Sequence, residues 1–331
     1  MTGSTGEPLL RISGLRVTLP GPAGPVDVIR GVDLRVDAGE IVGVAGESGS
    51  GKSLTASTLL NLLPPGAVVE GSIRFGEREL VGLDDRSWRQ VRGSEIAMVF
   101  QDSSAALHPM LSIGTQLTEH MRQGLGLDRA AARKRAVELL DRVRIPQAER
   151  VLKAYPHQFS GGMRQRIAIA VALACRPRLL IADEPTTALD VTVQAGILTL
   201  LDELRADGDL SVLFITHDLG VLASLTRRSY LFYAGRVMES GPTAEMLTAP
   251  KHPYTAALLA ARPHGLAGGR TLKAIPGSPV VPGQFPPGCP FAPRCGFSTP
   301  ECDSALPPVV ATSATRELAC PVAPSLVESG A

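Results

Sequence analysis

An α/β fold organised around a phosphate-binding loop is predicted by three adjoining stretches of this sequence. Residues 46–53 read Gly-Glu-Ser-Gly-Ser-Gly-Lys-Ser and match the pattern G-x-x-x-x-G-K-[ST] at every fixed position. The β-branched run at residues 40–45 is typical of a buried strand, and residues 52–63 are typical of a helix that stops at Pro64. A strand, a glycine loop and a helix in this order provide what phosphate binding needs.

The glycines of this loop let the backbone turn so that successive N–H groups point inward and form an anion site. Lys52 would place its charge at the β- and γ-phosphates, and the Ser53 hydroxyl would bind Mg²⁺. The alternative is a glycine-rich turn before an ordinary helix, but the lysine, the serine and the strand are all present. We therefore expect a nucleoside triphosphate to bind at Gly46, Glu47, Ser48, Gly49, Ser50, Gly51, Lys52 and Ser53.

Length and composition indicate one large domain, or one domain with an appendage. Of the 331 residues, 44% are hydrophobic, which is enough for a sizeable core. The net charge of +1 gives no sign of a nucleic-acid-binding surface, and an aromatic content of 4% argues against a base-stacking platform. No apolar run approaches the roughly 20 residues that span a bilayer, and the N-terminal residues do not resemble a secretory signal. We therefore expect a cytosolic chain.

The residues before the loop predict an antiparallel pair of strands. Residues 9–19 and 26–36 alternate apolar and polar side chains, and a loop rich in proline and glycine separates them at residues 20–25. Such a pair could cover the base of the nucleotide. Residues 71–75 predict a further strand after the loop and its helix.

A second group of elements starts with the apolar run at residues 95–100, a predicted strand that ends in Gln101. A polar residue at the end of such a strand is a candidate ligand of the nucleotide or its metal, although taken alone it fits a surface position equally well. A polar loop at residues 102–109 follows. Helices are then predicted at residues 113–123, 128–144 and about 149–155.

Residues 159–166 predict a second anion site on the chain. Ser160 with Gly161 and Gly162 opens an apolar helix, and a helix N-terminus of this kind suits a negatively charged ligand. A capping serine followed by flexible glycines is the alternative interpretation. Because one nucleotide needs only one such site, two in one chain are unusual.

Two more strands end in candidate catalytic residues. The apolar strand at residues 178–182 ends in Asp183 and Glu184. Asp183 fits the Mg²⁺ shell, and Glu184 can act as general base on a water in line with the γ-phosphate. Acidic residues that end a strand at a turn are the structural alternative. His217 follows the buried strand at residues 211–216 and is a candidate γ-phosphate contact, although a lone histidine is usually structural or solvated.

The last third of the chain changes character at about Pro250. Before this point, residues 230–239 predict a short hairpin, and a helix from about Thr243 closes the main domain. Beyond it, proline and glycine are dense, and residues 265–270 resemble a linker. We therefore expect a main domain at residues 1–250 with a helical subdomain at about 102–175, and a cysteine-bearing C-terminal extension at residues 251–331.

The order of these motifs resembles the nucleotide-binding subunit of ATP-binding-cassette transporters over about residues 9–250. One branch of the family, the peptide/nickel importers, is resembled more closely still. The resemblance lies in the sequences of residues 156–166 and 183–192 and in the extension that begins at His252-Pro-Tyr-Thr255. The sequence departs from the family at residues 15–25, which lack the aromatic ring that many members stack on adenine. The motifs in order are the loop at 46–53, Gln101, Ser160-Gly-Gly-Met-Arg-Gln165, Leu179-Leu-Ile-Ala-Asp-Glu184, Ala188-Leu-Asp190 and His217.

The resemblance implies a phosphate-loop nucleoside triphosphatase core with an antiparallel β subdomain and a helical subdomain, paired head to tail with a second subunit. ATP would bind between the loop of one subunit and the signature residues of the other, with Asp190 on the dimer seam. Gln101 would also couple closure of the dimer to a membrane subunit. The signature residues that act on the partner's ATP would be Ser160, Gly161, Gly162 and Gln165. Hydrolysis would depend on Glu184, His217, Lys52 and Gln101, and Mg²⁺ on Ser53, Gln101 and Asp183.

The resemblance also implies partners and a location. A related, non-identical ATPase, two transmembrane permease subunits and an external solute-binding protein would complete an importer, with this chain peripheral on the cytoplasmic face of the cell membrane. Peptides are the expected solute, with nickel or glutathione as alternatives, and no nucleic acid is expected. The rival class is a soluble cassette ATPase that acts on ribosomes or DNA, but such chains usually carry two cassettes or long insertions.

Four cysteines near the end of the chain suggest a metal centre. Their spacing, C-x5-C-x6-C-x17-C, departs from the short pairs of structural zinc sites, and four thiolates also suit a [4Fe–4S] cluster. The tail resembles the extension of peptide-importer ATPases, some of which hold an iron–sulfur cluster. We expect a cluster, with zinc and with free or disulfide-bonded cysteines as alternatives, at Cys289, Cys295, Cys302 and Cys320. Cys175 is expected to be a small core residue.

Overall fold

The computed structural model describes residues 7–102, 106–187, 189–208, 210–262 and 274–322. The chain divides into two compact units: unit 1 comprises residues 1–35, 42–81 and 216–331, and unit 2 comprises residues 36–41 and 82–215. Ala188 of the sequence motif and the linker predicted at residues 265–270 lie outside the described residues.

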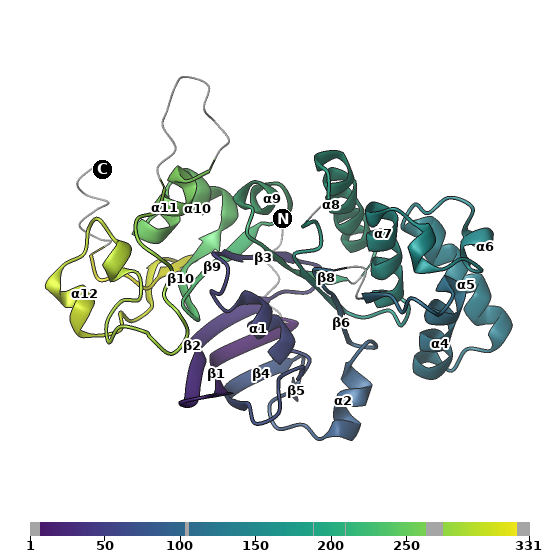
Figure 1. Ribbon diagram of the computed structural model, residues 1–331, viewed down its shortest axis with the longest axis horizontal. Coiled ribbons are helices and arrows are strands. Elements are labelled where there is room, and N and C mark those ends of the chain that lie inside the picture. Colours follow the sequence, from purple (N-terminus) through teal and green to yellow (C-terminus); the bar gives the residue numbers. More distant parts are fainter. Residues whose placement is uncertain (1–6, 103–105, 188, 209, 263–273, 323–331) are drawn as a thin grey trace. The chain divides into compact units, whose positions relative to one another are not determined.

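Unit 1 contains the antiparallel sheet that the alternating sequence predicts, in the strand order β2-β1-β4-β5 (Figure 1). Leu10 lies opposite Phe75 in the register of β1 and β4, and both side chains are buried. Exposed Arg11 separates buried Leu10 from buried Ile12, which is the alternation expected of a sheet with one face in the core. The strands are β1 (Leu10–Gly21), β2 (Gly24–Val36), β4 (Val68–Phe75) and β5 (Arg78–Glu79).

A second set of strands in unit 1 has the order β11-β12-β10-β9-β3. Strands β3 and β9 run parallel, and β9 and β10 form the predicted hairpin, in which Tyr233 lies opposite Arg236. The C-terminal extension adds β12 to the edge of β10, with Leu318 opposite Glu239. The strands are β3 (Ile41–Gly46), β9 (Arg228–Tyr233), β10 (Arg236–Pro242), β11 (Val310–Ser313) and β12 (Arg316–Leu318).

The helix after the phosphate-binding loop, α1 (Lys52–Thr58), is shorter than the predicted helix at residues 52–63. The N–H groups of Leu60 and Asn61 bond to carbonyls three residues back, and Asn61 has a φ of +49°. A left-handed residue of this kind ends an α-helix, so the apolar pattern outlasts the helix. The other helical segments of unit 1 are α9 (Leu219–Leu225), α10 (Thr243–Thr248), α11 (Pro253–Ala260), η2 (Ala292–Arg294) and α12 (Pro300–Ser304).

The extension shares a hydrophobic core with the β9–β10 hairpin. Tyr233 and Met238 of the hairpin are buried in one cluster with Tyr254 and Phe291 of the extension. The Tyr233 and Tyr254 ring centroids are 4.8 Å apart, and the Phe291 ring stands edge-on to Tyr233 at 5.5 Å. Aromatic pairs in these arrangements add to the stabilisation from burial alone, so hairpin and extension stabilise each other.

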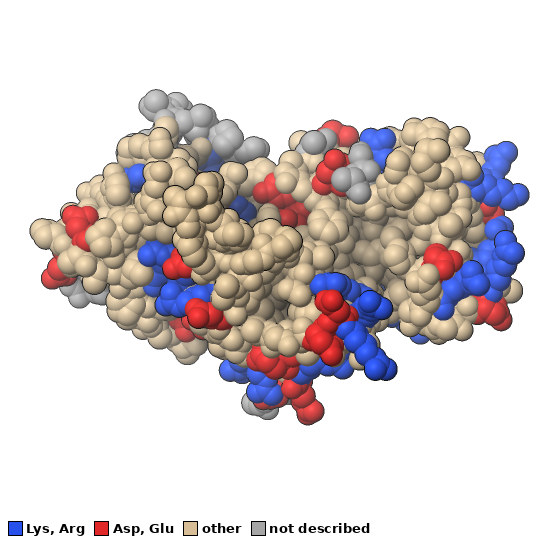
Figure 2. All heavy atoms as spheres, turned by 60° about the horizontal axis from the view of Figure 1, so that its bottom comes forward, with Lys and Arg blue, Asp and Glu red and all other residues tan. Residues whose placement is uncertain are grey.

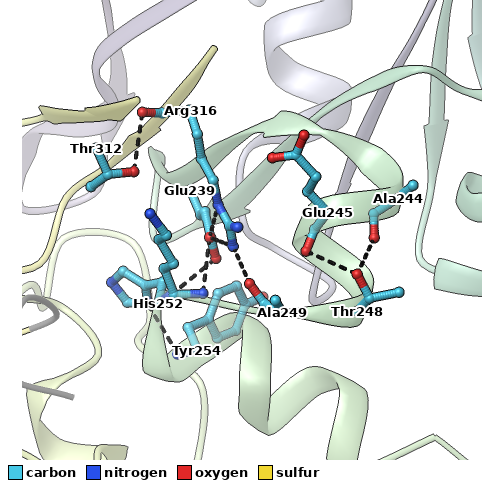
Figure 3. A network of polar contacts seen from close by, with 10 residues as sticks. Glu239, Ala244, Glu245, Thr248, Ala249, His252, Tyr254, Thr312 and Arg316 are labelled. Carbon is cyan, nitrogen blue, oxygen red and sulfur yellow. Dashed lines mark hydrogen bonds and ion pairs between the residues drawn. The ribbon is translucent and has the colours of Figure 1, made fainter. Parts of the chain in front are cut away.

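A buried ion pair lies beside this core (Figure 3). The Glu239 carboxylate, from β10, accepts a hydrogen bond of 2.9 Å from Arg316 Nε of β12. It also accepts the backbone N–H of His252 at 3.1 Å, at the start of α11. Arg316 in turn donates to the Ala249 carbonyl at 2.6 Å. Since both charged side chains are almost fully buried, this mutual satisfaction is what makes their burial tolerable.

Unit 2 contains three parallel strands in the order β8-β7-β6. Leu179 lies opposite Ile96 on one side and opposite Ser211 on the other. Every residue of β7 and β8 is buried, as expected of parallel strands covered on both faces, which is why they read as continuous apolar runs. The strands are β6 (Ile96–Val99), β7 (Leu179–Asp183) and β8 (Ser211–Thr216).

Several helices of unit 2 begin at polar residues whose side chains cap them. The side chains of Ser112, Asp128, Ser160 and Asp190 each accept the backbone N–H three residues on. The helices are α2 (Asp85–Val91), α4 (Ile113–Leu125), α5 (Arg129–Arg142), α6 (Ala148–Val151), η1 (Pro156–Gln158), α7 (Gly161–Ala172) and α8 (Val191–Ala206). Within the described ranges, every helix is too short or too polar to cross a bilayer. Basic and acidic side chains are interspersed over the face shown in Figure 2.

Candidate functional site

The phosphate-binding loop of unit 1 joins β3 to α1, as predicted, and two of its glycines are required by space. A Cβ on Gly46, which has a φ of +150°, would lie 2.1 Å from the Phe232 carbonyl oxygen. A Cβ on Gly51, which has a φ of +103°, would lie 2.7 Å from Ile29 Cδ1. Neighbouring strands therefore press on the loop from two directions and fix its path.

Lys52 lies across this loop with its ammonium group bonded to the loop's own oxygens. Its Nζ donates to the carbonyls of Gly46 at 2.9 Å and Glu47 at 2.8 Å, and lies 3.4 Å from Ser50 Oγ. Phosphate oxygens are charged and accept stronger hydrogen bonds than carbonyls do. The ammonium is thus held where it can exchange these partners for a phosphate, while Ser53 is exposed at the start of α1.

Glu47 of the loop is held by two residues of the C-terminal extension, which the sequence did not reveal. Arg294 donates to both carboxylate oxygens, with Nη1 to Oε2 at 2.6 Å and Nη2 to Oε1 at 3.0 Å. The Glu47 N–H donates to Tyr254 Oη at 3.0 Å. The sequence feature that could have pointed to these contacts is Glu47 itself. A carboxylate inside an anion-binding loop is expected to pair with a cation, because it would otherwise repel the bound anion.

Unit 2 brings two predicted catalytic residues into contact. Gln101 Nε2 donates to the Glu184 carboxylate at 3.1 Å, and Thr187 Oγ1 donates to the same carboxylate oxygen at 3.0 Å. Asp183 is the last residue of β7 and is buried, whereas Glu184 is half-buried and Gln101 is exposed. The two carboxylates therefore follow one another at the end of a buried strand. Thr187 was not predicted as part of this group.

The predicted signature residues form the N-terminus of α7. Ser160 is exposed and caps the helix by accepting the Met163 N–H at 3.4 Å. A Cβ on Gly162 would lie 2.5 Å from Val193 Cγ1, so α7 packs closely against α8 there. Gln165, in contrast, is only 2% exposed, so its side chain is buried within unit 2.

The two remaining candidates, Asp190 and His217, lie at strand or helix ends and are both exposed. Asp190 accepts the Val193 N–H at 2.9 Å and caps α8. His217 directly follows β8. The loop residues and His217 belong to unit 1, and Gln101, Asp183, Glu184, Asp190 and the signature residues belong to unit 2. Their roles stay predictions.

The tail cysteines are partly gathered. Cys289 and Cys302 are buried in the core that contains Phe291, with Cys295 packed against it, and the Cys289 N–H donates to the Cys302 carbonyl at 2.6 Å. Burial raises the pKa of the Cys289 thiol, and the neighbouring thiols of Cys302 and Cys295 raise it further. Cys320 lies in a separate apolar cluster.

The tail cysteines do not form a preformed ligand set for the predicted iron–sulfur cluster or its zinc alternative. Among the described residues, which include all the cysteines, no three His, Cys, Asp or Glu side chains converge as a metal ligand set. The expectation for Cys175 was wrong: it is half-buried, and its thiol donates to the His120 carbonyl at 3.2 Å. Burial raises the pKa of this thiol too.

Two family models match the chain. Residues 29–187 match the ABC transporter model, and residues 238–302 match the model of the oligopeptide/dipeptide transporter C-terminal region. The chain is 45% identical over 312 residues to the oligopeptide transport ATP-binding protein OppD of Salmonella typhimurium, which covers 94% of this chain and 93% of that protein. It is 44% identical to the OppD protein of Escherichia coli over 95% of this chain and 93% of that protein.

Two solved structures of ATP-binding cassettes also resemble this chain over most of its length. A dimeric ATP-binding cassette in a post-hydrolysis state, bound to ADP and Pi, matches with a TM-score of 0.63 and 29% identity, over 71% of this chain and 98% of that one. The cbiO1 protein of Clostridium perfringens, part of the ABC transporter complex cbiONQ, matches with a TM-score of 0.64 and 25% identity, over 74% of this chain and 92% of that one.

Proposed function

This chain belongs to the family of ABC transporter ATPases, and from that premise we propose that it is the ATP-hydrolysing subunit of an importer for oligopeptides or dipeptides. The observation that carries the proposal is the 45% identity to an oligopeptide transport ATP-binding protein along 94% of the chain. The match at residues 238–302 supports the peptide branch in particular, because that region belongs to oligopeptide and dipeptide transporters.

In the proposed mechanism, the loop at residues 46–53 holds the phosphates of ATP. Lys52 balances the charge of the β- and γ-phosphates, and successive loop N–H groups complete the anion site. The Ser53 hydroxyl, the Asp183 carboxylate and the Gln101 amide supply oxygen ligands of the kind that Mg²⁺ prefers. The bound metal would add positive charge where negative charge develops during hydrolysis.

Glu184 is the proposed general base, which orients and deprotonates the attacking water. Its contacts with Gln101 and Thr187 support this role, because they fix a carboxylate that must point in one direction. His217 is the proposed contact to the γ-phosphate. Both assignments come from the family pattern and are tested by the substitution of Glu184 described below.

We further propose that the chain works as a head-to-tail dimer with a related, non-identical ATPase. Ser160, Gly161 and Gly162 would then contact the partner's ATP from the N-terminus of α7. Asp190 would lie on the seam, and the exposure of its apolar neighbour Val191, at 81%, supports a protein contact there.

The permease subunits are proposed to dock on unit 2. Met110 is 77% exposed, and Phe100, Leu111 and Tyr155 are also exposed. The Ile113 N–H donates to the Ala154 carbonyl at 2.9 Å, so the segments that carry Leu111 and Tyr155 run next to each other. Apolar side chains exposed on neighbouring segments favour a protein partner. The chain would then sit peripherally on the cytoplasmic face of the membrane, with a solute-binding protein on the opposite side.

Reconstitution in lipid vesicles tests this function. The chain, its partner ATPase and the two permeases are assembled, and ATP hydrolysis is measured with the binding protein loaded with a tri- or tetrapeptide. We expect hydrolysis and peptide uptake to rise together on loading. Uptake of nickel or glutathione with no response to peptide would contradict the peptide assignment. An ATPase rate that is the same with and without the permease subunits would contradict a role in transport.

For the tail, we propose a [4Fe–4S] cluster on Cys289, Cys295, Cys302 and Cys320, with zinc as the alternative; it takes no part in the steps above. The gathering of Cys289, Cys295 and Cys302 in one core supports it, and Val322, two residues after Cys320, packs both against that core and against the cluster that contains Cys320. Metal analysis after anaerobic purification decides. We expect about four iron atoms per chain, as a four-thiolate cubane requires. One zinc per chain, or no metal, would contradict the cluster.

A further inference from the structure

The phosphate-binding loop carries an acidic residue that its proposed task disfavours. Residues 46–53 contain one cation, Lys52, and one anion, Glu47, so the side chains of the loop have no net charge. A triphosphate is strongly negative, and a nearby carboxylate repels it. Glu47 is therefore tolerable in the loop only if something removes the effect of its charge.

Arg294 supplies that charge from the far end of the chain. Its guanidinium forms a two-pronged ion pair with Glu47, and the arginine side chain is 4% exposed and the glutamate side chain 20% exposed. The two residues are 247 positions apart in the sequence. Since bidentate arginine–carboxylate pairs are the strongest of their kind, the pair restores a net positive charge to the loop without leaving a free carboxylate.

The guanidinium is itself held in place. Arg294 Nε donates to the Pro276 carbonyl at 2.9 Å, and Nη1 also donates to Tyr233 Oη at 3.2 Å. The Tyr233 and Phe291 rings lie 5.7 Å and 5.9 Å from the guanidinium carbon. The hydrogen bonds to Glu47 and, less strongly, to Tyr233 raise the pKa of Arg294 although burial opposes the shift, so it keeps its charge at any working pH. Because its own guanidinium is held in place, Arg294 fixes the position of the Glu47 carboxylate.

Tyr254 fixes the backbone of the same loop residue. Its hydroxyl accepts the Glu47 N–H at 3.0 Å and donates to the Phe232 carbonyl at 3.2 Å. With the Glu47 carbonyl bonded to Lys52, each polar group of Glu47 has a defined partner. The extension therefore controls both the charge and the path of the second residue of the loop.

We propose that Arg294 is a positioning residue of the ATP site, which holds Glu47 and cancels its charge so that the loop accepts a triphosphate. The proposal rests on the proposed role of residues 46–53 in ATP binding. It gives the C-terminal extension a direct part in nucleotide affinity, beyond any part in transport.

The test is the ATP dissociation constant of the full-length chain, measured with a fluorescent ATP analogue for a small set of variants. Arg294→Gln leaves the Glu47 carboxylate unpaired, and we expect binding to weaken about tenfold or more. Arg294→Lys keeps the charge but not the fork, and should fall between this variant and the wild type. Adding Glu47→Gln to Arg294→Gln removes the unpaired charge, so affinity should largely return.

Measurements at different ionic strengths and a matched control variant distinguish a loss of ATP affinity caused by charge repulsion from one caused by unfolding. The gap between wild type and Arg294→Gln should narrow at high salt, because repulsion is screened. Arg316→Gln removes an equally buried arginine from its pair with Glu239, which does not touch the loop. This control should lower the melting temperature and leave the ATP affinity of the folded protein within about twofold.

Three outcomes would overturn the proposal: wild-type affinity in Arg294→Gln, a double variant as weak as the single one, or a loss that salt does not reduce. If Arg294→Gln does not fold, Arg294→Lys and the double variant decide in the same way. A wild-type chain that fails to bind the analogue would instead overturn the role of residues 46–53, so the two failures are distinguishable.

Discussion

Glu184 occupies a backbone conformation that costs free energy and that its surroundings enforce. Its φ is +47°, in the left-handed region, which costs a residue with a Cβ about 1 kcal/mol. The Glu184 N–H is bonded to the Ile215 carbonyl at 2.9 Å, which ties the residue to the end of β8. Strain of this kind persists where a side chain must point in one direction. The conformation holds the carboxylate of the residue proposed as general base, and its role is tested by substitution.

Replacing this carboxylate should separate binding from hydrolysis. Glu184→Gln keeps the size and the hydrogen bond to Thr187 or Gln101 but cannot accept a proton. We expect ATP binding to be retained and the ATPase rate of the assembled transporter to fall about a thousandfold. Asp202→Asn, on the exposed face of α8, is the control and should keep the wild-type rate. Normal turnover in Glu184→Gln would remove this residue from the mechanism.

At the level of residues, the sequence identified groups that local patterns define. Lys52, Ser53 and Glu184 were predicted because a loop or a strand end marks them within a few positions. Arg294 was missed because its partner Glu47 is 247 positions away, and no spacing rule links them. Gln165 was assigned by its place in a motif, and only the fold reveals that its side chain is buried.

At the level of elements, caps and periodicity were informative where they occurred together. The helix predicted at residues 128–144 matches α5 and its cap Asp128, and the strands β1, β2, β6, β7 and β8 were predicted within a few residues. The helix α8 was not predicted, although Ile197, Leu200, Leu201 and Leu204 have helical spacing and are buried. The early end of α1 could not be predicted, because the left-handed turn at Asn61 leaves no clear sequence signal.

The start of α11 should make stability depend on pH. His252 caps this helix by accepting the Tyr254 N–H at 2.9 Å, and it is fully buried near Glu239 and Arg316 (Figure 3). Burial lowers its pKa from 6.5 to about 4, although Glu239 and the Ala319 carbonyl oppose this shift. The unfolded chain therefore takes up this proton first. The contribution of His252 to the free energy of unfolding is fully present above pH 6.5. It is lost as the pH falls toward 4, and the total loss is about 3 kcal/mol.

Urea unfolding at pH 7 and pH 5 measures this loss. Between these values the wild type should lose about 2 kcal/mol more than His252→Asn, because asparagine can cap the helix and does not titrate. The wild type and His252→Asn share all the carboxyl groups that titrate at lower pH. The difference between their losses of unfolding free energy therefore reports on His252 alone. An equal loss in the two proteins would assign the pH dependence to other groups.

At the scale of the whole molecule, the C-terminal extension is part of the structure that carries the phosphate-binding loop. Compact unit 1 includes residues 42–81 and residues 216–331 together. Tyr254 and Phe291 complete the core around Tyr233, Arg316 neutralises Glu239, and Arg294 neutralises Glu47. The boundary predicted at residue 250 followed a shift in composition, which reports on loops and prolines and not on where side chains pack. That boundary stays a prediction, and truncation tests it.

A chain that ends at Pro250 should fail to fold as a cassette. It would expose Tyr233 and Met238, each worth roughly 2 kcal/mol of burial, and would remove Arg316 and the His252 N–H, which bind the Glu239 carboxylate. The loss of about 4 kcal/mol from the two exposed side chains alone is close to the lower end of the whole stability of a typical domain. We expect insoluble protein, or soluble protein without a cooperative melting transition. The full-length chain, melted under the same conditions, is the control. If the Pro250 chain also melts cooperatively at the wild-type temperature and binds ATP, the extension is an independent domain and its contacts with the loop are dispensable.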